Sequence, residues 1–422
     1  MKNINKALLL CLMLLVGGVG SLVALSGCSA SDVEYDNDAS IANNTNASSE
    51  LSIAVLGQNS FLETAALRFE EMHDGRYTIN IVVYDDFASY SQTINTAVMS
   101  GMGEDIIHAA HLTWERLAIA NRLVNLDNYL NFGPGVFYQN VLDAFLLGGG
   151  RYVVPLSFHL EAFTFGDMVD VPHNLDIFTF DDFLALTNAH PSALPMMSPR
   201  GAWAASIAER FFNLQFDDFI CLTSRRSNVY SSEFIHLLEG VQSMSEGDHP
   251  WYDGRQTIII EDILFNPSMA SSGMPDYSNF HILTNSRGEG MVSTFDIIAM
   301  NANSQNQELA GRLMQFLLSE EMQASPEIWQ TAVNKNAAIA NAHTLYNSIR
   351  VAEGSVIPDE FDLETNIAAF NRLAARASMV ATSDPFIRDF VRTEMTRFFD
   401  NEVSAEQAAH NLHARLTTYL NE

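Results

Sequence analysis

Basic side chains are scarce in this chain of 422 residues. It has 22 Lys and Arg against 51 Asp and Glu, which gives a formal net charge of −29 at pH 7. That excess of negative charge excludes a bulk electrostatic attraction to nucleic acid or to anionic lipid. Cysteine is scarce too, because a total of three excludes a disulfide framework. The hydrophobic fraction of 47% is that of an ordinary globular protein, and the length suits two or three domain units of about 150 residues each.

The amino terminus has the pattern of an export signal. Lys2 and Lys6 precede an apolar stretch, Ala7 to Leu25, that is interrupted by glycines and one serine. A charged segment followed by an apolar one is typical of a signal peptide, although this stretch is also long enough for an uncleaved membrane anchor. Residues 25–28 read LSGC and end at Cys28, which resembles the bacterial lipobox. That resemblance implies cleavage before Cys28 and attachment of lipid to its sulfur.

The segment after the lipobox has almost no apolar mass. Residues 29–50 consist mainly of Ser, Asn, Asp and Ala, so they cannot bury enough surface to offset their conformational entropy. We therefore predict a lipoprotein signal peptide over residues 1–27 and a disordered tether over residues 28–50. The folded body would then begin at Leu51 and lie at the extracytoplasmic face of the cell membrane.

Strand and helix patterns alternate in the first part of the folded body. Short β-branched or apolar runs are followed by segments with apolar residues at helical spacing, and the predicted elements are strands at Leu51–Leu56, Tyr77–Tyr84 and Glu104–Ile107 and helices at Phe61–His73 and Ser89–Met99. This alternation favours a parallel sheet that is covered by helices on both faces.

A second α/β region follows the glycines at 148–150. Thr179 to Asp182 has the form of a helix capping box, and a second cap stands at Ser404, before the last helix. The other predicted elements are a strand at Thr257–Phe265, an extended stretch at Ile282–Met300, an amphipathic helix at Gln307–Met322 and helix from Asp362 to the end.

Four stretches of the sequence resemble the family 1 extracellular solute-binding proteins of ABC importers, the group that includes maltose-binding protein. The stretches are Thr96–Leu126, Gly150–Gly166, Ile297–Met322 and Asp400–Glu422, and they occur in the family's order. The resemblance implies an α/β fold of two lobes, the type II periplasmic-binding-protein fold. Each lobe is expected to have a mainly parallel sheet flanked by helices, with hinge crossovers between the lobes. The implied N-lobe comprises residues 51–155 and 291–330, and the implied C-lobe comprises residues 156–290 and 331–422.

The function that this resemblance implies is binding without chemistry. The chain would be the lipid-anchored receptor of an ABC importer, would hold a solute between its lobes and would deliver it to permease subunits in the membrane. A sugar or oligosaccharide is the expected solute because it is the commonest load of the family. No cofactor, metal or nucleic acid is expected, and the protein is expected to be a monomer.

Candidate ligand-binding residues follow the predicted strands, because ligands of α/β folds sit at the carboxyl ends of strands. Aromatic rings offer flat faces to a sugar, and polar side chains bond to its hydroxyls. The candidates are Gln58, Asn59, Asp86, Phe87, His111, Trp114, His159, Glu161, Arg200, Trp203, Asn266 and Arg388. For each aromatic the alternative role is core packing, and for Asp86 or Arg200 it is a solvated surface group. Where the maltose-binding branch grips its sugar, this chain has Ala109, Leu112 and Thr113, which argues against maltose itself.

Several other functions stay open at the level of sequence. A secreted glycan-processing enzyme would need paired carboxylates or an activated nucleophile, but the adjacent acid pairs at 85–86, 181–182 and 217–218 are typical of helix caps, and no G-x-S-x-G motif occurs. His108 and His111 lack a third metal ligand nearby. Within the binding class the rivals are an anionic solute bound by arginines, a polyamine, a peptide, and a sensor that does not transport. The arginines concerned are Arg200, Arg225, Arg226 and Arg255.

Overall fold

The computed structural model describes residues 49–165, 177–190, 200–245, 258–263, 277, 280–351, 361–380 and 384–422. The predicted signal peptide, Cys28 and all but the last two residues of the predicted tether lie outside these residues. The chain from Ser48 to Glu422 forms one compact unit, and all that follows concerns this unit.

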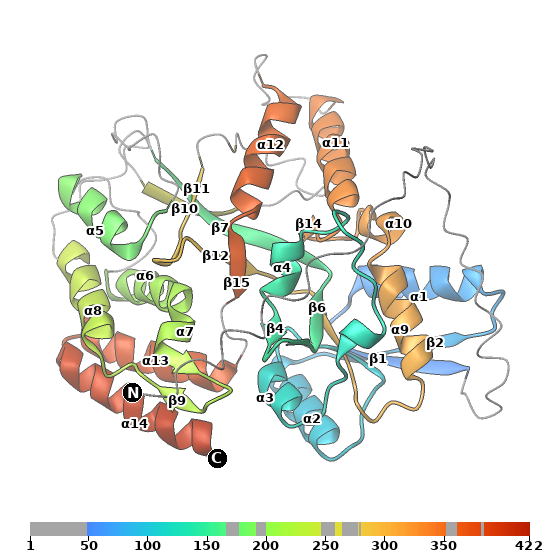
Figure 1. Cartoon of the computed structure of the whole chain (residues 1–422), viewed down its shortest axis with the longest axis horizontal. Coiled ribbons are helices and arrows are strands. Elements are labelled where there is room, and N and C mark those ends of the chain that lie inside the picture. The colour runs from blue at the N-terminus through green and yellow to red at the C-terminus, as the bar shows by residue number, and fades with distance from the viewer. Residues whose placement is uncertain are drawn as a thin grey trace, which may run out of the picture. The chain divides into compact units, whose positions relative to one another are not determined.

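A five-stranded sheet begins the described chain and forms the centre of what we call the first lobe. Its order is β2 (Thr78–Tyr84), β1 (Glu50–Leu56), β3 (Ile106–His108), β13 (Ile297–Met300) and β6 (Val153–Pro155) (Figure 1). Strand β1 is parallel to β2 and β3, whereas β13 is antiparallel to both β3 and β6. In Figure 1, helices α1 (Ser60–Met72) and α9 (Gln307–Leu317) lie on one side of these strands, and α2 (Phe87–Met99) and α3 (Trp114–Ile119) lie on the other. The α/β layering predicted from the alternating patterns is therefore confirmed.

Local sequence signals explain where the first helices begin. The Asn59 side chain accepts a hydrogen bond from the Leu62 amide at 3.0 Å and caps α1. The Asp86 carboxylate accepts from the amides of Ala88 and Ser89 and caps α2. Each cap satisfies backbone donors that the first turn of a helix leaves free. The caps also fix the polar side chains at the ends of β1 and β2, where ligand contacts were expected.

A second sheet forms the centre of the second lobe. Its order is β10 (Ile258–Ile263), β7 (Ser157–Phe165), β12 (Gly290–Ser293) and β15 (Ala377–Val380), and the short strands β11 (His281–Ile282) and β14 (Thr331–Ala332) also pair with β7. Every pairing of β7 is antiparallel, and β12 with β15 is the one parallel pair of this sheet among the described residues.

The strand directions differ from the predicted mainly parallel sheets, although the two-lobed α/β architecture itself is confirmed. Strand β7 carries the chain out of the first lobe, and β12 brings it back toward β13. Outgoing and returning strands that lie side by side must run in opposite directions, so the crossovers impose antiparallel pairing. Because β12 belongs to the second sheet, the chain returns between Ser293 and Ile297, while the expected lobe boundary at residue 291 falls within β12.

Helices cover the second sheet. They are α5 (Phe180–Ala189), α6 (Arg200–Leu214), α7 (Phe216–Phe219), α8 (Ser232–Ser245), α13 (Pro385–Phe399) and α14 (Ala405–Asn421). The predicted capping box is present, since Thr179 and Asp182 bond to each other's backbone amides. The stretch after Asp362 was predicted to be helical throughout, but β15 interrupts it after α12 (Leu363–Ala374). The predicted helix Gln307–Met322 breaks at Ser319, which caps the short α10 (Glu320–Gln323).

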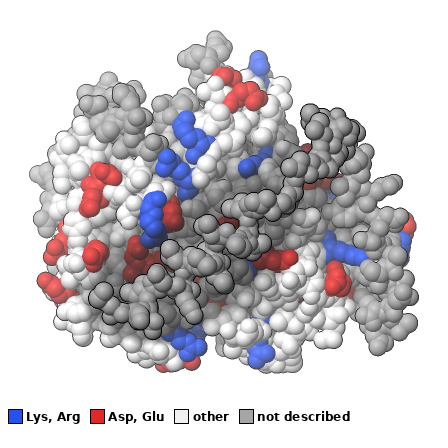
Figure 2. Space-filling view, viewed as in Figure 1, with Lys and Arg blue, Asp and Glu red and all other residues white. Residues whose placement is uncertain are grey.

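The remaining elements are short or lie close to the crossovers. They are η2 (Leu126–Asn128), α4 (Gln139–Asp143), β4 (Leu146–Leu147), β5 (Gly150–Arg151), β8 (Ile220–Cys221), β9 (Arg226–Ser227) and α11 (Lys335–Val351). Among the helices of the described residues, none has both the length and the apolar character that crossing a bilayer requires. On the face shown in Figure 2, basic side chains lie among acidic ones.

Candidate functional site

A cavity of about 300 Å³ lies where the two sheets approach each other, and both lobes line it. The loop after β3 supplies Ala110 and His111, and α3 begins with Trp114, which also lines the cavity. Strand β7 supplies His159 and Glu161, and α6 supplies Arg210 and Asn213. The rest of the lining is Phe145, Met291, Val292, Ser293, Thr294, Phe295, Ile297, Val380 and Arg388. A molecule in this cavity would therefore touch both lobes at once.

The crossover segments next to the cavity are tied together by polar contacts. The Ser157 hydroxyl lies 3.0 Å from the Asp296 carboxylate and 3.2 Å from the Gln330 side-chain oxygen. The Phe295 amide donates to the same Gln330 oxygen at 3.4 Å. The Gln330 side-chain nitrogen contacts Nδ1 of His159, a residue of the cavity wall. Three chain segments that link the lobes thus share one hydrogen-bonded cluster.

Asp296 is the charged member of this cluster. Its burial alone would raise the pKa of the carboxyl, but the neighbouring His108 and the donors Ser157 and Asn59 outweigh burial, so the pKa lies below its ordinary value. His108 Nε2 lies 3.6 Å from the carboxylate. Asp296 is therefore ionised at neutral pH and holds groups of the first lobe next to the start of β7.

His111 faces the cavity as a neutral ring. Burial lowers its pKa below the ordinary histidine value, and the electrostatic effects of the neighbouring His108 and Arg388 lower the pKa further, against an opposing effect of Asp296. Its ring makes an edge contact with Phe87 at a centroid separation of 5.4 Å. A neutral imidazole offers one donor and one acceptor, which suits a hydroxyl group.

Aromatic side chains occupy both walls. Trp114 and Phe145 are buried, whereas the Phe295 side chain is 62% exposed and lies beside His159 at a ring separation of 5.7 Å. An exposed phenylalanine costs hydration free energy unless a ligand or partner covers it. Phe295 is therefore the ring in this cavity that is most open to a ligand.

The structure brings five of the sequence candidates together at this cavity, and the roles of all the candidates remain predictions. The five are His111, Trp114, His159, Glu161 and Arg388. Asn59 and Asp86 cap helices, Gln58 is exposed, and Phe87 contacts the ring of His111 without lining the cavity. Arg200 and Trp203 lie on α6, but their side chains, together with all of Asn266, lie outside the described part.

Several lining residues were missed at the level of sequence. Thr294 and Phe295 directly follow β12, so the rule that found His111 after β3 would have found them too. Arg210 lies within α6 and follows no predicted strand, so the same rule could not find it. Asn213 carries no comparable signal.

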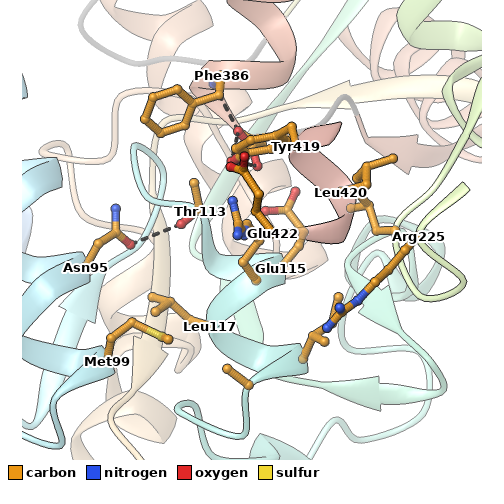
Figure 3. A pocket seen from close by; sticks show the side chains of 15 residues that line it. Asn95, Met99, Thr113, Glu115, Leu117, Arg225, Phe386, Tyr419, Leu420 and Glu422 are labelled. Carbon is orange, nitrogen blue, oxygen red and sulfur yellow. Dashed lines mark hydrogen bonds between the residues drawn. The ribbon is translucent and has the colours of Figure 1, made fainter. Parts of the chain in front are cut away.

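A second cavity, of about 390 Å³, lies between α2 and α3 of the first lobe and the carboxyl-terminal helices of the second (Figure 3). Its lining is largely apolar and includes Met99, Leu117, Phe386 and Tyr419. Arg225, a candidate for anion binding, lines this second cavity rather than the first.

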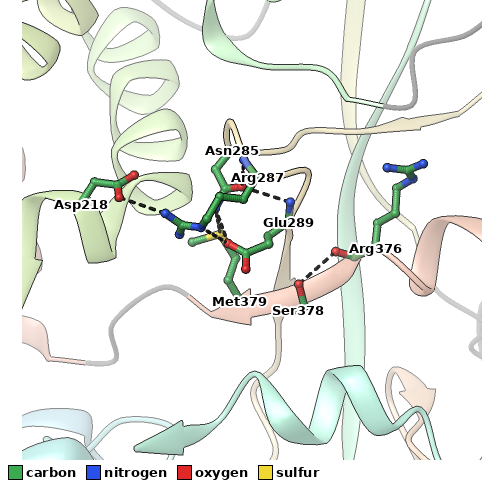
Figure 4. A network of polar contacts seen from close by, with 7 residues as sticks. All are labelled: Asp218, Asn285, Arg287, Glu289, Arg376, Ser378 and Met379. Atoms are coloured by element: carbon green, nitrogen blue, oxygen red, sulfur yellow. Dashed lines mark hydrogen bonds and ion pairs between the residues drawn. The ribbon is translucent and has the colours of Figure 1, made fainter. Parts of the chain in front are cut away.

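The adjacent acid pairs take part in local contacts. Asp86 and Asp182 are helix caps, and Asp181 lies 2.8 Å from His236. Asp218 pairs with Arg287 at 3.0 Å in a network that holds the turn between β11 and β12 through Asn285 and Glu289 (Figure 4). Within the described ranges, no three His, Cys, Asp or Glu side chains gather in a way that could hold a metal ion.

Comparisons with known proteins find likeness in structure only. No protein-family model matches the chain, and no curated protein matches it. Among solved structures, the sugar-binding protein MalE from Xanthomonas citri matches with a TM-score of 0.61 and 16% identity over 88% of this chain and 97% of that one. An ABC substrate-binding protein of Listeria monocytogenes in complex with cycloalternan matches with a TM-score of 0.57 and 14% identity over 88% of this chain and 99% of that one.

A periplasmic oligogalacturonide-binding protein from Yersinia enterocolitica matches with a TM-score of 0.56 and 15% identity over 88% of this chain and 99% of that one. A designed esterase is also among the matches, with a TM-score of 0.54. At these identities the likeness establishes the fold, which is the two-lobed fold of type II periplasmic binding proteins.

Proposed function

We propose that this protein is the solute receptor of an ABC importer, that it binds a saccharide between its two lobes, and that it presents the loaded form to membrane permease subunits. The observation that carries the proposal is the cavity whose lining comes from both lobes and combines aromatic rings with hydrogen-bonding side chains. The matches to a sugar-binding protein, an oligogalacturonide-binding protein and a complex with cycloalternan support the same class of ligand.

The mechanism consists of binding and closure. A ligand can favour the closed arrangement only by as much as it binds that arrangement more tightly than the open one. Trp114 and His111 contact the ligand from the first lobe, and Phe295 and Glu161 contact it from the crossover side. Because the two sets belong to different walls, both are satisfied together only when the lobes are close. The receptor performs no reaction on its solute.

A saccharide fits this lining for two physical reasons. The exposed face of Phe295 can cover the apolar face of a sugar ring, and the buried indole of Trp114 adds a second apolar surface. Neutral His111, Asn213 and the hydroxyls of Ser293 and Thr294 can pair with ring hydroxyls. Such a mixture leaves few of the ligand's polar groups without a partner.

The membrane anchor rests on the LSGC sequence at residues 25–28. Cys28 would carry the lipid, the residues after it would form the tether, and the two lobes would face the exterior of the cell membrane. Replacing Cys28 with Ser should abolish labelling by a radioactive fatty acid and move the chain from the membrane fraction to the soluble fraction. Unchanged labelling or fractionation would remove the anchor from the proposal and leave the binding site intact.

A thermal-shift screen of the mature chain, residues 28–422 with Cys28 replaced by Ser, tests saccharide binding directly. A bound saccharide at 100 times its dissociation constant should add about 2.7 kcal/mol to the free energy of unfolding. Phe295→Ala should weaken binding about tenfold, because a stacked aromatic ring and its buried area contribute roughly 1–2 kcal/mol. Leu67→Ala is the matched control. The exposed fraction of Leu67, 63%, is close to that of Phe295, but Leu67 lies on α1 and does not line the cavity.

Two outcomes would contradict the proposal. If no saccharide raises the melting temperature while a peptide or polyamine does, the ligand class is wrong. If a bound glycan is cleaved or modified by the purified protein, the chain is an enzyme. A receptor that only senses its solute would bind as proposed but would not restore uptake in cells that lack the importer's receptor.

A further inference from the structure

The charges that line the cavity have the opposite balance to the charges of the whole chain. The chain carries −29, yet the ionised side chains in the lining are the arginines Arg210 and Arg388 and the single acid Glu161. At physiological ionic strength the electric field of distant charges fades within about 8 Å, so a small ligand in the cavity responds mainly to these groups and to the carboxylates of Asp296 and Glu209 just behind the lining. A locally positive site is therefore compatible with a strongly acidic protein.

The two arginines differ in how far their charge is compensated. Arg210 forms an ion pair with Glu161, which lies in the same wall. Arg388 has a weaker contact, because its Nε lies 3.9 Å from Glu209. Glu209 is itself held by Arg392, whose Nη2 lies 2.9 Å from the carboxylate. One carboxylate thus serves two guanidinium groups, and Arg388 is the more distant of the two.

Arg388 is also positioned to meet a ligand. It lies on α13, one turn before Arg392, and its side chain is 53% exposed. Across the cavity stands His111, whose pKa is lowered in part by the charge of Arg388, so the positive field of Arg388 extends over the gap between the lobes. The hydroxyls of Ser293 and Thr294 add neutral donors to the same lining.

We propose that the saccharide bound in this cavity carries a negatively charged group, a carboxylate, phosphate or sulfate, which Arg388 binds between the two lobes. This inference rests on the proposed function and narrows its ligand class from saccharides in general to acidic saccharides. The guanidinium fork matches two oxygens of such a group, and charged hydrogen bonds of this kind are the strong ones. When the lobes close on the ligand, its negative charge would also neutralise the part of the Arg388 charge that the distant Glu209 does not.

Isothermal titration calorimetry with matched pairs of saccharides tests this inference on the mature chain, residues 28–422 with Cys28 replaced by Ser. The pairs are glucuronate and glucose, a galacturonate disaccharide and its methyl ester, glucose 6-phosphate and glucose, and glucose 6-sulfate and glucose. In each pair the sugar is kept while the charge changes. The charged member of at least one pair should bind ten times more tightly than its neutral partner, and the pair that responds identifies the group.

A matched pair of variants locates the effect. Arg388→Gln should weaken binding of the charged saccharide about tenfold or more and should leave the affinity for its neutral partner nearly unchanged. Arg392→Gln removes the same charge from the same helix and the same Glu209, but Arg392 does not line the cavity. Its effect on either ligand should be less than twofold. Both arginines are exposed, so the melting temperature without ligand should stay the same in both variants.

The possible results separate this inference from the function on which it rests. If neutral saccharides bind as tightly as their charged partners, or if Arg388→Gln and Arg392→Gln weaken binding equally, the acidic ligand class is overturned and the saccharide receptor remains. If neither neutral nor charged saccharides bind, both proposals are overturned. If a charged saccharide binds and Phe295→Ala does not weaken it, the anion site lies outside this cavity and the assignment to Arg388 is wrong.

Discussion

Arg116 and Tyr419 form a contact between the lobes on the side of the second cavity. Arg116 lies on α3 of the first lobe, and its guanidinium carbon stands 4.5 Å from the centre of the Tyr419 ring on α14 of the second lobe. The Tyr419 hydroxyl donates to the Asp384 carboxylate at 2.8 Å, and Asp384 caps α13 through the amides of Phe386 and Ile387. The contact exists only while α3 and α14 are close, so it should favour the closed arrangement even without ligand.

The size of this effect follows from the contact. A cation over an aromatic ring at an exposed site contributes about 0.5–1 kcal/mol, and the attraction between Arg116 and Asp384 adds a screened amount. About 1 kcal/mol in total corresponds to roughly a fivefold change in an equilibrium constant. We therefore expect Arg116→Gln to lower the ratio of closed to open molecules about fivefold. The ligand's dissociation constant should rise by up to the same factor, although Arg116 does not line the ligand cavity.

Fluorescence energy transfer between labels on α2 and α8 measures the closed fraction, and calorimetry measures ligand affinity. Arg225→Gln is the control, because Arg225 is exposed and lines the same second cavity, as Arg116 does, but no contact of Arg225 with Tyr419 is present. Arg116→Lys should retain most of the effect, since a lysine can also lie over the ring. An unchanged closed fraction in Arg116→Gln, or an equal change in Arg225→Gln, would refute the reasoning.

Two further predictions concern groups with shifted pKa values. Hydrogen bonds from Ser224 and Thr223 lower the pKa of the Cys221 thiol to about 7, so alkylation by iodoacetamide should reach half its maximal rate near pH 7. Ser224→Ala should move that midpoint to higher pH. A midpoint near about 8.5 in the native protein would contradict this prediction. The pKa of Asp296 is lowered by folding, so the carboxylate stabilises the fold above the unfolded pKa, near 3.8, and this contribution is lost as the pH falls through the folded pKa. Asp296→Asn should therefore lower the free energy of unfolding at pH 7 by about 1.5–3 kcal/mol and have a smaller effect below pH 4. The control Asp85→Asn, at an exposed position, should change the free energy of unfolding little. Urea unfolding measures both variants, and an equal loss in Asp296→Asn at both pH values would exclude the charge as the cause.

Short-range sequence signals predicted the elements of the first lobe well. The polar cap and apolar spacing of residues 59–72 lie within a few turns of chain, so they are visible without the fold. The second sheet could not be predicted in the same way, because β7 pairs with strands more than a hundred residues away and two of them, β11 and β14, are two residues long. A strand of two residues is too short to show the alternation of apolar and polar side chains by which strands are predicted. The strand β15, Ala377–Val380, likewise pairs with β12, which is far away in the sequence.

The same difference of range governs the candidate site. His111 and Trp114 lie between the end of a buried strand and the start of the next helix, where a local rule finds them. Arg210 reaches the cavity because α6 packs against β12 and β15, which only the tertiary structure reveals. Asn59 and Asp86 show why the same local rule also selects residues with another role. Both follow a strand, as a ligand-binding residue would, but their side chains cap the helix that comes next.

Helix α13 connects the ligand cavity with the contact between the lobes. Its amino-terminal cap, Asp384, accepts the hydrogen bond from Tyr419, and Arg388 on its first turns lines the cavity. The cavity lining is also joined to the hydrogen-bonded cluster of the crossover segments. His159 of the lining contacts Gln330 of that cluster, and Phe295 of the lining precedes Asp296 of the cluster in sequence. A ligand that binds Arg388 from the first lobe would hold α13 close to that lobe, and with it Tyr419, which is bonded to Asp384 and lies against Arg116. Binding and the interlobe contact should therefore be cooperative, and the loss of affinity in a variant lacking both Arg116 and Arg388 should differ from the sum of the two single losses.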